Sequence, residues 1–259
     1  MAIGVFDSGI GGLTVFKTII KNFKDTDLYY LGDTARVPYG NKSKETIRRY
    51  SLECSNFLIN NYQIDCLVIA CNTASSYALD FLKSKLNIPV IGVVEPGAQL
   101  ASQLTKNKKV GIIGTVGTIK SNSYYNAIKK ICSDIEIYQN PSPLLVPLVE
   151  EGRIDHEITK LAVKEYISPL VEKGIDTLVL GCTHYPVLKN VIVEIYPNLK
   201  LVDSSEAIIP DIVSCLSADK REGGKKLILT TDETEAFNAL KDRLVGGIKL
   251  QKIDLKEII

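Results

Sequence analysis

The sequence predicts an α/β protein of two pseudo-symmetric domains, each a mostly parallel sheet flanked by helices, with the active site in the cleft between them. Two observations support this fold class. Short runs of β-branched residues alternate with longer helical stretches along all 259 residues, and a segment of the first half recurs in the second. Strands that alternate with helices of this length imply parallel sheets covered on both faces.

Nine short apolar runs are the expected buried strands, because each is rich in β-branched residues and is bounded by turn-forming residues. In chain order they are Ile3–Phe6, Leu28–Leu31, Cys66–Ala70, Val90–Val93, Val110–Ile113, Thr177–Leu180, Lys200–Val202, Lys226–Leu229 and Ile248–Lys252. Helices are expected between them, including Thr46–Asn60 and Ile154–Val171. His156 falls in the second of these stretches and is expected at the surface.

An internal repeat relates the two halves. Asp65–Cys71 matches Asp176–Cys182 position for position at an offset of 111 residues. An offset of 107 places Ile3–Ser8 over Val110–Thr115. In parallel α/β sheets, ligands bind beyond the carboxyl ends of the strands. Two such halves that face one another would therefore bring Cys71 and Cys182 to one cleft from opposite sides.

Cys71 and Cys182 are the first candidates for chemistry. A single free cysteine is usually an inert core residue. Here two cysteines hold equivalent positions, each at the end of a strand and before an expected helix, where backbone N–H groups and the helix dipole lower a thiol pKa. The remaining cysteines lack such a setting and are expected in the core: Cys54, Cys66, Cys132 and Cys215.

A glycine-rich loop, Asp7–Gly12, follows the first strand. Turns of this kind hold anions on helix N-terminal amides. The loop has neither the GxGxxG spacing of a dinucleotide site nor the GxxxxGK[ST] pattern of a P-loop. An α-amino acid suits it better, because Ser8 and the amides can hold a carboxylate while Asp7 neutralises the ammonium group or assists Cys71.

Polar residues directly follow both cysteines: Asn72 and Thr73 in the first half, Thr183 and His184 in the second. They are expected to cap helices and to bind substrate, two roles that are compatible. His184 stands two residues after Cys182, where it can orient or charge that thiol as in a Cys–His pair. Cys182 and His184 lack further ligands for a metal site.

Three further segments complete the candidate site. Gly32-Asp33 and Pro38-Tyr39-Gly40 are expected to form a loop over the same strand ends. Gly114–Thr118, with Thr115 and Thr118, is the polar counterpart in the second half. Glu150 is a candidate neighbour of Cys182.

Composition excludes several classes of partner. The formal net charge of +1 gives no reason to expect nucleic acid or an anionic membrane. No apolar run approaches the ~18 residues of a membrane span, and no basic-then-apolar leader opens the chain. We therefore expect a cytoplasmic protein with reduced thiols, and the absence of CxxC pairs disfavours a zinc ribbon.

The ordered set of motifs resembles the glutamate racemases of the Asp/Glu racemase superfamily over nearly the whole chain. The matching segments are Phe6–Gly12, Gly32-Asp33, Val37–Gly40, Ala70–Ala74, Gly114-Thr115 with Thr118, and Gly181–His184. Each motif alone is weak, whereas their order is specific. Related aspartate racemases usually carry Glu after the second Cys-Thr, so His184 favours glutamate.

The resemblance implies a role for each residue. Cys71 and Cys182 match the family's proton donor and acceptor pair, and Asp7, Asp33, Glu150 and His184 match groups that support the thiols. The substrate-binding positions implied are Asp7, Ser8, Pro38, Tyr39, Gly40, Asn72, Thr73, Thr115, Thr118, Thr183 and His184.

The resemblance also implies a wider function. The family supplies D-glutamate for bacterial peptidoglycan, works without pyridoxal phosphate or metal, and is commonly a homodimer. The implied domains are about 1–97 with 210–259, and about 98–209.

Two alternatives stay open from the residues. Another reaction on the same scaffold, such as aspartate racemisation, decarboxylation or isomerisation, would turn over a different acid and leave glutamate inert. A non-catalytic amino-acid-binding protein of the periplasmic type also has two α/β lobes, and would bind an amino acid without turnover.

Overall fold

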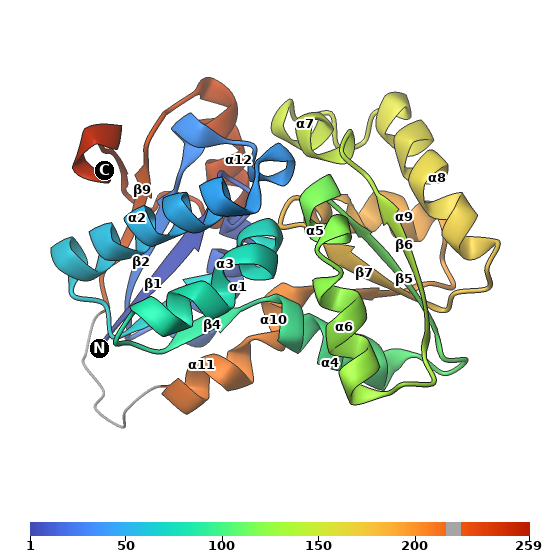
Figure 1. The fold of residues 1–259 in the computed structure, drawn as a ribbon. Coiled ribbons are helices and arrows are strands. Elements are labelled where there is room, and N and C mark those ends of the chain that lie inside the picture. Colours follow the sequence, from blue (N-terminus) through green and yellow to red (C-terminus); the bar gives the residue numbers. More distant parts are fainter. Residues whose placement is uncertain (216–223) are drawn as a thin grey trace.

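The computed structural model describes residues 1–215 and 224–259, and their strands form two parallel sheets side by side (Figure 1). The first sheet contains β1 (Ala2–Asp7), β2 (Asp27–Gly32), β3 (Cys66–Ile69), β4 (Val90–Gly92), β9 (Lys226–Thr230) and β10 (Leu250–Lys252), in the order β10-β9-β2-β1-β3-β4. The second contains β5 (Lys109–Gly114), β6 (Glu136–Pro141), β7 (Thr177–Gly181) and β8 (Lys200–Val202), in the order β6-β5-β7-β8. The predicted fold class is confirmed.

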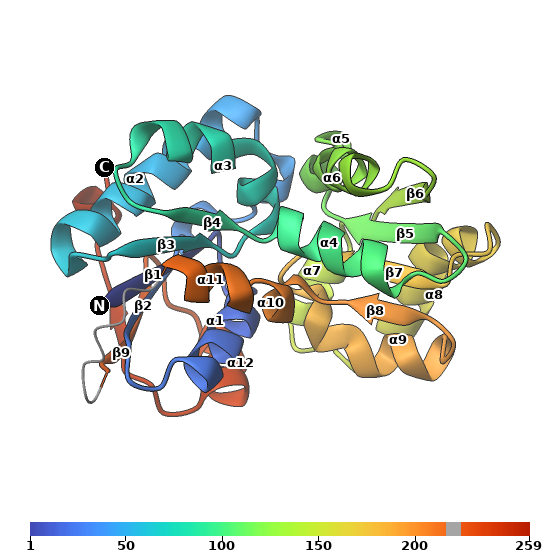
Figure 2. The ribbon, with the colours of Figure 1, turned by 90° about the horizontal axis from the view of Figure 1, so that it is seen from below.

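Helices cover both sheets. Around the first lie α1 (Leu13–Asn22), α2 (Lys44–Tyr62), α3 (Asn72–Lys85), α11 (Ile209–Cys215) and α12 (Glu235–Val245). Around the second lie α5 (Val116–Lys120), α6 (Ser123–Ile131), α7 (Leu145–Glu150), α8 (Glu157–Val171) and α9 (Lys189–Ile195). Figure 2 shows α4 (Val94–Leu104) and α10 (Ser204–Ala207) where the chain passes between the two parts. Short 3₁₀ helices are η1 (Thr34–Arg36), η2 (Tyr39–Asn41), η3 (Tyr185–Leu188) and η4 (Leu255–Glu257).

We call the part built on the first sheet the first lobe (residues 1–93 with 208–215 and 224–259) and the part built on the second sheet, with α4 and α10, the second lobe (residues 94–207). The domain boundaries expected near residues 97 and 210 stay predictions, and residues 216–223 of the expected first domain lie outside the described residues. None of the described helices is both long and apolar enough to cross a bilayer.

The repeat seen in the sequence is present in the strand register. Ile3 pairs with Cys66 between β1 and β3, and Val110 pairs with Thr177 between β5 and β7. These are the residues that the two offsets superimpose. The lobes therefore present β3 and β7, which lead to Cys71 and Cys182, in equivalent positions beside the strand that begins each repeat.

One strand, β6, was not expected. It is a half-exposed edge strand that ends in Asn140-Pro141, so it lacks the buried β-branched run by which the others were found. The repeat contains the missing signal. Asp27 pairs with Ala2, and Glu136 pairs with Lys109 at the corresponding register, so β6 is the counterpart of β2.

Capping residues explain where the two expected helices begin. Ser43 starts α2, because its hydroxyl accepts the Thr46 N–H at 3.2 Å. The second helix, α8, begins at Glu157, three residues later than expected. His156 is its cap, with Nδ1 accepting the Ile158 N–H at 3.1 Å, so His156 is exposed but lies outside the helix.

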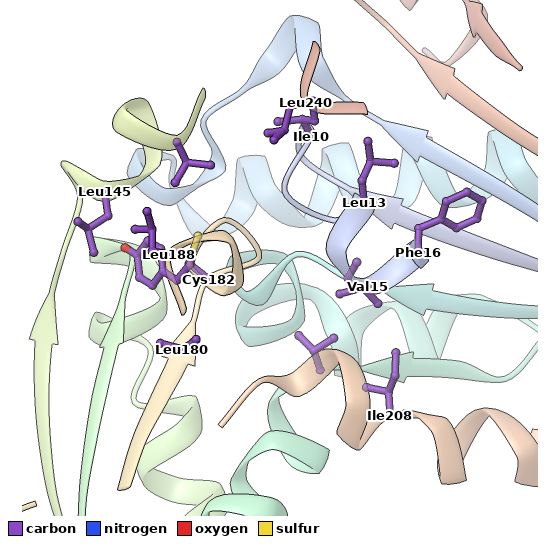
Figure 3. Close-up of a cluster of buried hydrophobic side chains, with 14 of the residues drawn as sticks. Ile10, Leu13, Val15, Phe16, Leu145, Leu180, Cys182, Leu188, Ile208 and Leu240 are labelled. Carbon is purple, nitrogen blue, oxygen red and sulfur yellow. The ribbon is translucent and has the colours of Figure 1, made fainter. Parts of the chain in front are cut away.

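Apolar packing joins the lobes close to one of the two candidate thiols. One buried cluster includes Leu13 and Phe16 of α1 together with Leu180 of β7 and Leu188 of η3, and Cys182 lies among the second-lobe members (Figure 3). Cys54 and Cys66 are buried as expected, whereas Cys132 and Cys215 are only half-buried. The core assignment is therefore wrong for the latter two, which end α6 and α11 near the surface.

Candidate active site

A cavity of about 320 Å³ opens between the lobes at the carboxyl ends of β3 and β7. Both candidate thiols line it, as do most other predicted site residues: Ser8, Pro38, Tyr39, Gly40, Asn72, Thr73, Thr115, Glu150, Thr183 and His184. Three predicted residues do not line it: Asp7, Asp33 and Thr118. The fold thus brings most of the predicted site residues together around one cavity, and the other three side chains do not line it.

Cys71 caps the N-terminus of α3. Its sulfur accepts the Ala74 N–H at 3.5 Å, and its thiol donates to Ser8 Oγ at 3.5 Å. Burial, and then the negative charge of Asp7, raise the pKa of Cys71 to about 12 despite these hydrogen bonds. The expected lowering by a backbone N–H of the helix terminus is present at Ala74, but burial and Asp7 outweigh it. Cys71 is a neutral thiol at physiological pH, and thus a proton donor.

Cys182 has different surroundings. The expected helix does begin after His184, at Tyr185, but it is the 3₁₀ helix η3, and the His184 side chain makes no capping hydrogen bond. The partner of Cys182 is His184, whose Nδ1 lies 3.7 Å from Cys182 Sγ. The other ring nitrogen, His184 Nε2, lies 3.0 Å from Glu150 Oε1. The predicted association of His184 and Glu150 with Cys182 is present in the structure.

The electrostatics of this triad favour a charged imidazole. Burial alone would lower the pKa of His184, but hydrogen bonds to Cys182 and Glu150 outweigh it and raise that pKa to about 10. His184 is therefore an imidazolium at neutral pH. His184 Nδ1, 3.7 Å from Sγ, is thus placed to exchange a proton with Cys182.

Asp7 lies behind the cavity wall at the end of β1. Its carboxylate is fully buried and accepts the Gly9 N–H at 2.9 Å and the Thr183 hydroxyl at 3.3 Å. Burial raises its pKa. A side chain at residue 12 would come within 2.4 Å of Asp7 Cβ, so glycine is required there. Asp7 does not line the cavity and reaches its wall through the hydrogen bond with Thr183. Its predicted contact with the ammonium group stays a prediction.

Asp33 acts through the segment that carries Pro38, Tyr39 and Gly40. It accepts hydrogen bonds from Tyr39 OH at 2.5 Å and from Arg36 Nε at 2.7 Å, and it is fully buried. Burial raises its pKa even though Tyr39 and Arg36 oppose the shift. The hydrogen bonds of the Asp33 side chain go to Tyr39, Arg36 and Thr231. Asp33 anchors the Tyr39 side of the cavity, and no direct contact with Cys71 or Cys182 supports the predicted catalytic role.

Three threonines join the lobes beside the cavity. Thr73 Oγ1 lies 2.8 Å from Thr115 Oγ1 and 3.3 Å from Thr118 Oγ1. Thr115 also caps α5 by accepting the Thr118 N–H at 3.1 Å. Thr118 is buried and does not line the cavity, so its predicted substrate contact becomes support of Thr73 and Thr115.

Six residues that line the cavity were not predicted from the sequence. Val146 and Pro147 stand on α7 one helical turn before Glu150, so the placement of Glu150 on a helix would have identified them. The others are Val37, Asn41, Val116 and Pro143. Within residues 1–215 and 224–259, no three His, Cys, Asp or Glu side chains are grouped to hold a metal ion.

The chain is similar to known proteins over its whole length. Residues 3–212 match the model of the Asp/Glu/Hydantoin racemase family. A glutamate racemase of Sulfurihydrogenibium sp. is 61% identical over 258 residues, which cover 100% of this chain and 99% of the relative. A glutamate racemase of Persephonella marina is 57% identical over 259 residues, which cover 100% and 99%.

Solved structures agree as well. A Bacillus anthracis glutamate racemase superimposes with a TM-score of 0.91 at 37% identity, covering 98% of this chain and 97% of the other. The Francisella tularensis glutamate racemase, solved in complex with D-glutamate, gives a TM-score of 0.89 at 37% identity with the same coverage. The chain therefore belongs to the Asp/Glu/Hydantoin racemase family and, within it, to the glutamate racemases.

Proposed function

We propose that this protein interconverts L-glutamate and D-glutamate by two-base proton transfer at Cα, with Cys71 on one face and Cys182 on the other. One observation carries the proposal: thiols from equivalent strand ends of the two lobes line a single cavity. A planar carbanion must be reached from both faces for its configuration to be inverted. Two acid/base groups on opposite walls meet that requirement without moving the substrate.

The different surroundings of the thiols assign the first step. Cys182, beside the His184 imidazolium, is the thiolate that removes the Cα proton of L-glutamate. Cys71, whose pKa is about 12, is the thiol that delivers its own proton to the opposite face. The product complex then contains a Cys182 thiol and a Cys71 thiolate. D-glutamate is deprotonated by Cys71 in the reverse direction.

Polar groups of both lobes would hold the substrate. Ser8, Asn72 and Thr73 from the first lobe line the cavity together with Thr115 and Thr183 from the second. Their hydroxyls and amides suit two carboxylates and one ammonium group. Preorganised donors around the α-carboxylate would stabilise the charge that develops when the weakly acidic Cα proton leaves.

The proposal extends to cofactors and to the cell. The two thiols supply acid and base, so no pyridoxal phosphate or metal is required, and activity should survive both chelation and borohydride. We propose that the enzyme provides D-glutamate for peptidoglycan in the cytoplasm and works as a homodimer, as its resemblance to the family implies. Light scattering of the purified protein tests the homodimer.

Racemisation in D₂O tests the reaction and its two-base course together. Purified protein with L-glutamate and no added cofactor should lose optical rotation until the enantiomers are equal. At early times the product should carry deuterium at Cα, while the remaining substrate carries almost none. Rapid incorporation of deuterium into unreacted substrate would indicate one shared base. Turnover of aspartate but not of glutamate would indicate a different racemase.

A further inference from the structure

A buried tyrosine outside the cavity lining connects the segments that carry the two thiols. Tyr124 of α6 is 1% exposed, and its hydroxyl accepts a hydrogen bond from Asn72 Nδ2 at 2.7 Å. Asn72 directly follows Cys71. The ring of Tyr124 lies against Gly181, where a Cβ would be 3.4 Å from Tyr124 Cε2, and Gly181 directly precedes Cys182.

The hydroxyl of Tyr124 has a second partner, and the two partners together determine to which of them the hydroxyl donates its proton. Tyr124 OH lies 2.9 Å from Ser204 Oγ of α10. A phenol carries one proton, and the Nδ2 group of Asn72 can only donate. The tyrosine oxygen therefore accepts from Asn72 and its proton is directed to Ser204. Gly97 makes room for this contact, because a Cβ there would lie 2.5 Å from Ser204 Oγ.

This arrangement orients the Asn72 amide. With Nδ2 bound to Tyr124, the carbonyl oxygen Oδ1 is turned to the other side of the amide. No described residue donates a hydrogen bond to Asn72 Oδ1, and Asn72 lines the cavity between the two thiols. An acceptor in this position attracts an ammonium group and repels a carboxylate, whereas the flipped amide would do the opposite.

We propose that Tyr124 is a positioning residue that holds the Asn72 amide with its oxygen toward the substrate, and thereby selects ligands that carry an α-ammonium group. Tyr124 acts through Asn72 and is not itself catalytic. The proposal rests on the proposed function, because it places the α-carbon of glutamate beside Asn72.

The test compares two ligands that differ only in the ammonium group. Binding of D-glutamate and of glutarate is measured by calorimetry for the wild type and for Tyr124→Phe, which keeps the ring. The dissociation constant of glutarate divided by that of D-glutamate measures the preference for the ammonium group. This ratio should fall about tenfold or more in the variant, as expected for loss of an oriented hydrogen bond to a charged group. Tyr196→Phe is the matched control: it loses a hydroxyl contact of 2.8 Å with Ser168 in the second lobe, and its ratio should not change.

A second variant tests the proton assignment and serves if Tyr124→Phe fails to fold in a thermal unfolding measurement. Ser204→Ala frees the Tyr124 proton to donate to a flipped Asn72 amide, so the ratio should fall about threefold. The role of Tyr124 would be overturned if the ratio is unchanged in both variants, or if the affinities for D-glutamate and glutarate fall by the same factor. A wild type that binds neither ligand and racemises nothing would instead overturn the proposed function.

Discussion

The two thiols occupy the same position in the repeat but have different neighbours. Burial, and then the negative charge of Asp7, raise the pKa of Cys71 and keep it protonated, whereas its hydrogen bond with Ser8 acts in the opposite direction. Cys182 has the His184 imidazolium, held in turn by Glu150. The proposed mechanism needs one thiol and one thiolate at the start of each turnover, and the different neighbours of the two cysteines suit that requirement.

Replacing His184 by Asn should separate the two directions of the reaction. The equilibrium constant between enantiomers is one, so kcat/KM must stay equal in both directions for any variant. Loss of the cation beside Cys182 should lower kcat by ~10²–10⁴, more from L to D, with a compensating fall in KM for L-glutamate. Circular dichroism progress curves from each enantiomer measure this. If kcat is unchanged in both directions and KM rises for both enantiomers, His184 binds substrate and does not assist proton transfer.

The charge on His184 can be measured directly. Its pKa of about 10 lies above the ordinary 6.5, so nitrogen NMR should show it protonated up to about pH 10. The exposed His156 provides an internal reference. Any stability from the charged imidazole is complete below about pH 6.5 and is lost as the pH rises to about 10. Glu150→Gln should lower the His184 pKa, and a pKa that does not change would exclude Glu150 as a cause.

At the scale of elements, the site is built from strand ends. β1 leads to Ser8, β3 to Cys71, β5 to Thr115 and β7 to Cys182, so four neighbouring strands of two sheets supply the walls. The remaining walls are α7 and η2, and η2 contacts α5 across the lobes. The approach is close because residue 40 is glycine: a Cβ there would lie 2.8 Å from Thr115 Cβ.

Gly40→Ala should therefore push η2 away from α5 and widen the cavity. We expect KM for both enantiomers to rise about tenfold, as expected when groups that position a substrate are displaced. Steady-state kinetics in both directions check the result. Gly247→Ala is the control, since a Cβ there meets nothing within 4 Å, and its kinetics should match the wild type. Equal kinetics in both variants would contradict the proposed role of the η2–α5 contact.

At the scale of the whole molecule, the two lobes are joined by polar contacts as well as by apolar packing. Thr14 Oγ1 donates to the Thr183 carbonyl at 3.1 Å, and Ser76 and Ser123 hydroxyls lie 2.7 Å apart. A substrate that contacts both cavity walls adds further bonds between the lobes. Its binding energy should therefore stabilise the entire fold.

Glutamate should accordingly raise the melting temperature. At 100 times its dissociation constant a ligand contributes ~2.7 kcal/mol, which for a chain of this size corresponds to roughly 5–10 °C. Differential scanning calorimetry with and without D-glutamate measures the shift. At one fixed glutamate concentration Gly40→Ala should show a smaller shift than the wild type. No shift at saturating glutamate would argue against binding at the lobe junction.

The sequence alone determined the α/β class, the repeat and the pair of strand-end cysteines. These features are local: hydrophobic runs predict buried strands, and residues at strand ends share an edge of the sheet whatever the rest of the fold. The edge strand β6 was not predicted, because a half-exposed strand has no such hydrophobic run. The start of α8 was not predicted correctly, because it depends on the His156 cap, which helix propensity does not reveal.

Only the tertiary structure decided how the site residues are used. It placed Asp7, Asp33 and Thr118 behind the cavity wall, and it brought Glu150 to His184 and Tyr124 to Asn72 from 34 and 52 residues away. It also reversed the expected pKa shift of Cys71. The physical reason is that burial and long-range neighbours set the charge of a buried group, and both arise only when distant segments pack together.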